Sequence, residues 1–78
     1  MNLSFQTLGK TVDVEFDSAS QHIVVYFGGV QIGEVWGDVL DYPADIQLGL
    51  IRGAAAISWE RKKLREIAEE ILSDELCN

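Results

Sequence analysis

Residues that could perform acid–base or nucleophilic chemistry are few in this chain. The 78 residues include one histidine and one cysteine, whereas nucleophilic catalysis needs an activated nucleophile held beside a base. His22 starts an apolar run and alternates away from Ile23 and Val25, which is typical of a surface histidine. Cys77 is the penultimate residue, where a fixed geometry is hard to hold. No catalytic residues are therefore indicated, and we expect that the protein is not an enzyme.

The patterns that hold metal ions or phosphate groups are not indicated either. Zinc sites need several cysteine or histidine ligands at regular spacings. Asp38, Asp41 and Asp45 could approach a hard cation, but they lack the alternating ligands and final glutamate of a calcium loop. The Gly28-Gly29 pair lies between two expected strands, whereas a phosphate-binding loop joins a strand to a helix. We expect no metal and no cofactor.

The distribution of charge along the chain is its strongest functional signal. The sequence has 13 acidic and 6 basic residues, a net charge of −7. Most of the basic residues lie between positions 52 and 65, where only Glu60 opposes them: Arg52, Arg61, Lys62, Lys63 and Arg65. The rest of the chain is strongly acidic, which favours attraction to a basic partner.

Two sets of acidic residues have a regular spacing. Asp13, Glu15 and Asp17 alternate along one expected strand, so that their side chains leave the same face about 6.6 Å apart. That spacing resembles successive phosphates along one nucleic-acid strand. The second set follows helical spacing and comprises Glu66, Glu69, Glu70 and Asp74. We predict that these residues bind the partner, together with Asp38 and Asp41 between the strands and the helices.

Local helix stability does not explain the second set. Carboxylates near the carboxyl end of a helix oppose its dipole, and basic residues near the amino end do the same. The ion pairs Lys62–Glu66 and Arg65–Glu69 stabilise the helix by only about 0.3 kcal/mol each, because a basic residue four positions before an acidic one is the weaker orientation. The pattern therefore favours either solubility or binding.

Period-two alternation predicts four short antiparallel strands, a β-meander over about residues 2–36. Val12, Val14 and Phe16 form the apolar face of the clearest strand. Gly9-Lys10 and Gly28-Gly29 suit two-residue turns between strands. A meander of this kind can leave one face of the sheet open to solvent.

Helical spacing replaces this alternation over about residues 44–74. Apolar residues recur there at steps of three, four or seven: Ile46, Leu50, Ala54, Ile57, Leu64, Ala68 and Ile71. One helix of that length would measure about 45 Å, against about 23 Å for the strands, so it must be broken or overhang the sheet. We predict helices over 44–55 and 58–74 with a break near Gly53 or Ser58, and one long helix as the alternative.

These elements predict a single α+β domain over residues 1–78, with the helices packed on one face of the sheet. No apolar run is long enough to span a membrane, and the first residues do not resemble a secretory leader. A single thiol fits a reducing compartment. We therefore expect a soluble cytoplasmic protein.

The charge pattern favours a protein-interaction module, an inhibitor or regulatory protein that docks on a basic, nucleic-acid-binding partner. Three alternatives stay open. Arg61, Lys62, Lys63 and Arg65, with Trp59 nearby, could bind nucleic acid. The chain could form a structural homodimer through a sheet edge or the helical stripe. The acidic residues could also form a solvated surface without a partner.

In size, acidity and order of strands and helices, the chain resembles the small inhibitors that phages encode against host nucleases and CRISPR complexes. The resemblance is one of profile over the whole chain and assigns no site residue. It implies a nucleic-acid mimic whose partner is a nuclease or a CRISPR-type complex.

Overall fold

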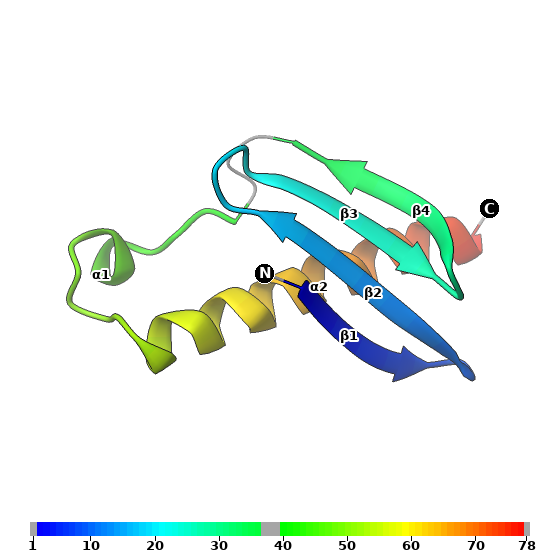
Figure 1. Cartoon of the computed structure of the whole chain (residues 1–78), viewed down its shortest axis with the longest axis horizontal. Helices are drawn as coiled ribbons and strands as arrows, with labels where there is room; N and C mark the ends of the chain where they lie inside the picture. Colours follow the sequence, from blue (N-terminus) through cyan, green and yellow to red (C-terminus); the bar gives the residue numbers. More distant parts are fainter. Residues whose placement is uncertain (1, 37–39, 78) are drawn as a thin grey trace.

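The computed structural model describes residues 2–36 and 40–77, and its first half is an antiparallel sheet (Figure 1). The strands are β1 (Asn2–Thr7), β2 (Lys10–Asp17), β3 (His22–Phe27) and β4 (Val30–Val35). Their order in the sheet is the order in the sequence, which confirms the predicted meander. Two helices follow, α1 (Ala44–Gln47) and α2 (Ala54–Cys77), and α2 packs on the sheet. The fold is α+β.

The turns between strands follow the backbone freedom of their residues. At the β3–β4 turn, Gly28 and Gly29 have φ values of +59° and +82°, as expected for a primed hairpin turn. The predicted Gly9-Lys10 turn is wrong by one residue, because Lys10 pairs with Thr7 and the turn consists of Leu8 and Gly9. Leu8 has a φ of +52°, so the tight turn holds a leucine in the left-handed region.

A single apolar layer lies between the sheet and α2. Its sheet side is the alternating face of β2 and β3, and its helix side is one stripe of α2. Leu40, from the segment between β4 and α1, is also fully buried there. The buried residues of this core are Val12, Val14, Phe16, Ile23, Val25, Leu40, Leu64, Ala68 and Leu72.

The break between the helices is placed differently from the prediction. The first helix is only Ala44–Gln47, and Gly49 and Gly53 then take φ values of +75° and +67°, which end a right-handed helix. Gly53, one of the two predicted break positions, therefore does lie at the break between the helices. The prediction at Ser58 is wrong, because this residue lies inside α2.

The first turns of α2 extend beyond the sheet, together with α1 and the residues between the helices (Figure 1). We call residues 44–57 the arm. A helix of 24 residues is about 36 Å long, whereas strands of six to eight residues reach about 20–27 Å. Leu50 is 73 % exposed and Ile57 is 48 % exposed, so the stripe predicted from Ile46 onward covers the sheet only from Leu64 onward.

Helix α2 approaches β4 closely at Gly33. A β-carbon on this glycine would lie 2.8 Å from Cγ2 of Ile71, closer than real side chains approach. The backbone of Gly33 does not itself need glycine, since its φ is not positive. The absence of a side chain at Gly33 therefore determines how closely the helix can pack against the sheet.

Gly33→Ala is expected to destabilise the protein by about 1–3 kcal/mol, the usual cost of overpacking a core. The double variant with Ile71→Ala should lose less stability than the sum of the two single variants, because the clashing methyl group is gone. Urea unfolding followed by circular dichroism measures both values. Full additivity of the two changes would contradict the close approach.

Candidate interaction surface: the open face of the sheet

One face of the sheet carries the strand acids, and neither of the two described helices covers it. Val12, Val14 and Phe16 point toward α2 and are at most 4 % exposed. Because side chains alternate along a strand, the three residues between and after them point the other way. The structure thus places Asp13, Glu15 and Asp17 together on this open face.

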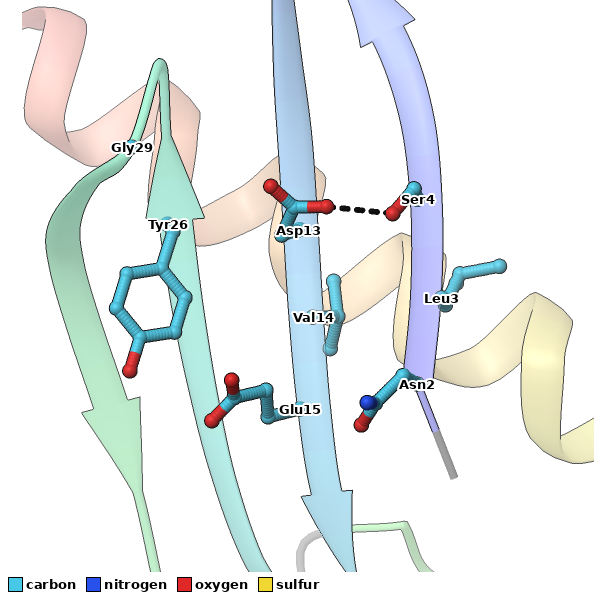
Figure 2. Close-up of a pocket in the computed structure, with 8 residues that line it drawn as sticks. All are labelled: Asn2, Leu3, Ser4, Asp13, Val14, Glu15, Tyr26 and Gly29. Atoms are coloured by element: carbon cyan, nitrogen blue, oxygen red, sulfur yellow. Dashed lines mark hydrogen bonds between the residues drawn. The ribbon is translucent and has the colours of Figure 1, made fainter.

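The strand register brings polar and aromatic side chains beside the acids. Asp13 lies between Ser4 on β1 and Tyr26 on β3, and the Ser4 hydroxyl donates a hydrogen bond to its Oδ1. Glu15 lies between Asn2 and Val24 in the same way. Figure 2 shows the Tyr26 ring and the Glu15 carboxylate projecting on the same side of the sheet. Apolar contact area is therefore available beside the charges.

Two shallow hollows join across this face. One has a volume of about 320 Å³ and is lined by Ser4, Asp13, Glu15 and Tyr26 among others (Figure 2). The other has a volume of about 330 Å³ and includes Asp17, His22 and Val24. Asn2 and Glu15 line both hollows, so the two form one continuous depression over β1, β2 and β3.

One further acidic residue of the open face, Glu34, was not predicted from the sequence. Strict alternation along β4 would place Glu34 on the core side with Val30 and Ile32. A register irregularity opposite Val25 and Tyr26 changes this, because Tyr26 pairs with Gln31 while Val24 pairs with Glu34. The bulge turns Glu34 to the open face. Only the single glycine in β4 hinted at a bulge in the sequence.

His22 closes one corner of the open face. Its Nε2 lies 3.0 Å from Oε2 of Glu34, and its ring stacks on Trp36 with a centroid separation of 3.5 Å and an angle of 9° between planes. Trp36 is 62 % exposed. The histidine is thus held between a carboxylate and an indole ring, which fixes its orientation at the edge of the acidic depression.

The open face carries acidic charge that basic side chains do not balance. Asp13, Glu15, Asp17 and Glu34 share it, with His22 as the only titratable base among the described residues of that face. Lys10 of β2 lies on the other face of the sheet. Its ammonium is 5.3 Å from the centroid of the Phe27 ring, which packs against the core. All other basic residues belong to the segment 52–65.

The helical acids do not join this surface. Glu66, Glu69, Glu70 and Asp74 are exposed on α2, which covers the opposite face of the sheet. The Oε1 of Glu69 accepts a hydrogen bond of 2.9 Å from Nε of Arg65. The structure therefore divides the predicted acidic residues into two separate surfaces.

The two predicted acidic residues between the strands and the helices, Asp38 and Asp41, are not placed on the open face by the structure. Asp41 is exposed beside the buried Leu40, and it has a φ of +52°. Asp38 lies outside the described residues. Neither residue is shown to belong to the open face.

One residue of the predicted basic patch, Arg65, already contacts other side chains of the same chain. The guanidinium of Arg65 lies 4.5 Å from the centroid of the Phe5 ring, in addition to its contact with the carboxylate of Glu69. Lys62, Lys63 and Trp59 line a hollow of about 170 Å³. The Trp59 ring is tilted against Tyr42 at 5.2 Å, so it anchors the chain before α1 to α2.

No protein family, curated protein or solved structure matches the chain. In the described ranges, no three histidine, cysteine or acidic residues are grouped so that they could hold a metal ion. No helix there is both long and apolar enough to cross a membrane. The functional assignment therefore depends on the geometry and charge of the surface.

The strand acids should make the stability of the protein depend on salt. Two carboxylates about 6.6 Å apart repel each other by about 0.6 kcal/mol in water, and added salt screens this repulsion. The melting temperature should therefore rise between about 10 mM and about 300 mM NaCl, across which the screening length falls from about 30 Å to below 10 Å.

The neutral variant Asp13→Asn/Glu15→Gln/Asp17→Asn tests the origin of this effect. Its melting temperature should rise less with salt, because the repulsion has been removed. Thermal melts of both proteins at the two salt concentrations measure the difference. Equal salt dependence would contradict strong mutual repulsion on the open face.

Proposed function

We propose that this protein is a non-enzymatic interaction module, an inhibitor or regulatory protein, whose open sheet face docks on a basic, nucleic-acid-binding surface of another protein. The observation that carries the proposal is the alignment of Asp13, Glu15 and Asp17 on a face left free by α2. The profile-level resemblance to phage inhibitors suggests a nuclease or a CRISPR-type complex as the partner.

The backbone supports this function because it positions the carboxylates before binding. Side chains on paired strands have a fixed spacing, so little conformational entropy is lost when a rigid partner docks. A partner site for a nucleic-acid strand presents basic side chains at the spacing of phosphates, which the strand acids approximate. The central positions of β2 and β3 add stiffness, since each has a hydrogen-bonded neighbour on both sides.

The side chains between the acids suit an interface core. Tyr26 lies opposite Asp13, and Val24 lies opposite Glu15, both on the open face and both partly exposed. Tyrosine is enriched among the residues that dominate binding energy, and charged residues around it contribute more to orientation and association rate. The surface thus combines an apolar centre with acidic surroundings.

Electrostatic attraction should also accelerate the encounter. The open face and the net charge of −7 create a negative potential that draws in a basic protein. This attraction weakens as salt shortens the screening length to about 8–10 Å near physiological ionic strength. Complexes of this protein should therefore dissociate in moderate salt.

Binding of nucleic acid by α2 is the second candidate function. The hollow lined by Lys62, Lys63 and Trp59 supports it, because it combines two cations with an aromatic ring. Glu66 also lines that hollow and opposes a polyanion. Arg65 already contacts a carboxylate and a phenyl ring. The open sheet face is the stronger site.

Reversing the strand acids should abolish partner binding. Asp13→Lys/Glu15→Lys/Asp17→Lys changes only outward-facing side chains, so circular dichroism should show an intact fold. The partner is first captured from a bacterial lysate on the wild-type protein, eluted in steps of salt and identified by mass spectrometry. Titration in solution should then show at least about a tenfold loss of affinity for the variant, or about 1.4 kcal/mol.

A matched variant separates surface geometry from net charge. Glu70→Lys/Asp74→Lys/Glu75→Lys makes the same change in charge on exposed residues of α2. Its affinity should stay within about threefold of wild type. Equal losses of affinity in both variants would show that binding depends on net charge alone, and would overturn the proposal. Capture of nucleic acid, lost on Lys62→Glu/Lys63→Glu, would favour the second candidate.

A further inference from the structure

Exposed apolar residues gather at the two opposite ends of α2. In the arm, Leu48 is 72 % exposed, Leu50 is 73 % exposed and Ile51 is 37 % exposed. The other end holds the β1–β2 and β3–β4 turns and the last turns of α2, and we call it the hairpin end (Figure 1). There, Leu8 and Leu76 are more than half exposed. Clusters of exposed aliphatic side chains on a soluble domain indicate an interface.

The hairpin end also contains a concave surface. A hollow of about 470 Å³ lies between β1 and the last turns of α2, lined by the apolar side chains of Phe5, Leu72 and Leu76 and by polar or charged residues that include Arg65 and Glu69. Protruding aliphatic side chains at one end of the molecule and a partly apolar hollow at the other are complementary shapes. They cannot meet within one chain, because the length of α2 separates them.

Charge divides α2 into two halves of opposite sign. Residues 54–65 contain four basic residues and one acidic residue, whereas residues 66–77 contain five acidic residues and no basic one. The first turn of the helix has no acidic residue and the last turn has no basic residue. This order is unfavourable for an isolated helix. A second helix lying antiparallel would place opposite charges side by side.

One exposed row of α2 is complementary to itself in that orientation. Ala55, Lys62, Glu69 and Leu76 are all exposed and recur every seven residues, so they lie on one side of the helix. In an antiparallel pair centred between residues 65 and 66, Lys62 faces Glu69 of the second copy and Ala55 faces its Leu76. The small Ala55 side chain allows close approach.

We propose that two copies of this chain form a dimer with two-fold symmetry through antiparallel α2 helices. The arm of each copy then covers the partly apolar hollow at the hairpin end of the other. A two-fold axis requires that one surface be complementary to itself, and the row on α2 meets this requirement. Pairing with the helices parallel would place like charges together, so the charge pattern selects the antiparallel arrangement.

The net charge of −7 does not oppose this contact strongly. The strand acids lie on the far side of the sheet, so in the dimer they are separated by two sheets and two helices. With about 10 Å between adjacent layers, the open faces lie more than about 20 Å apart, which exceeds the screening length of about 8–10 Å near physiological ionic strength. The dimer therefore leaves both open faces accessible, and it does not depend on the proposed function.

Charge exchange tests the dimer directly. Sedimentation velocity from about 1 μM to about 500 μM should show a reversible monomer–dimer equilibrium for wild type. Lys62→Glu and Glu69→Lys should each raise the dimer dissociation constant at least about tenfold, since each creates two contacts between like charges. An equimolar mixture of the two variants should recover the affinity, because every contact in the mixed dimer is again complementary.

Matched variants control for charge and folding. Lys63→Glu and Glu70→Lys make the same changes outside the row and should dimerise like wild type. Asp13→Lys/Glu15→Lys/Asp17→Lys should also dimerise normally, which separates this result from failure of the proposed function. Wild type that stays monomeric throughout, or a variant mixture that stays monomeric, would overturn the proposal. Circular dichroism checks that each variant is folded.

Discussion

A single helix can cover only one face of a sheet, and the rest of this structure depends on that constraint. The chain after β4 supplies one helix long enough to pack against the strands, and its buried stripe meets the apolar face of β2 and β3. A domain of this size has a thin core, so every residue of that layer matters to its stability. The consequence for function is that the second face of the sheet stays in contact with solvent. Its residues are free to serve binding.

The alternation of side chains explains much of what the sequence predicted. The strands, their order and the location of the acids of β2 follow from period-two patterning and from the glycines at the turns. Which face α2 covers was left open by the sequence, and the structure shows that it is the apolar face with Val12, Val14 and Phe16. By contrast, Glu34 was missed because its orientation depends on a bulge in β4, and an inserted residue changes which side chains face outward. The contact between His22 and Trp36 likewise depends on tertiary geometry.

The helical region shows where periodicity misleads. Ile46, Leu50 and Ile57 continue the spacing of the buried stripe, yet Leu50 and Ile57 are largely exposed. Two glycines with positive φ, Gly49 and Gly53, interrupt the helix before it reaches the sheet. The apolar spacing before the sheet therefore does not indicate packing within one chain. In the proposed dimer, the arm that contains Leu50 contacts the second copy.

The two acidic surfaces consequently have different roles in this account. The strand acids are proposed to form a rigid surface for a basic partner, and Glu69 of α2 is proposed to complement Lys62 in a second copy. Segregation of charge along α2 is unfavourable for a lone helix and becomes favourable between antiparallel helices. The proposed dimer would thus present two equivalent acidic faces pointing in opposite directions.

The central claim is that the open sheet face is the surface that binds a basic partner. A titration of the isotope-labelled protein with an arginine-rich peptide, followed by amide chemical shifts, tests it residue by residue. The largest shifts are expected at Ser4, Asp13, Glu15 and Tyr26. Shifts concentrated between Glu66 and Glu75, or spread evenly over all acidic residues, would contradict it.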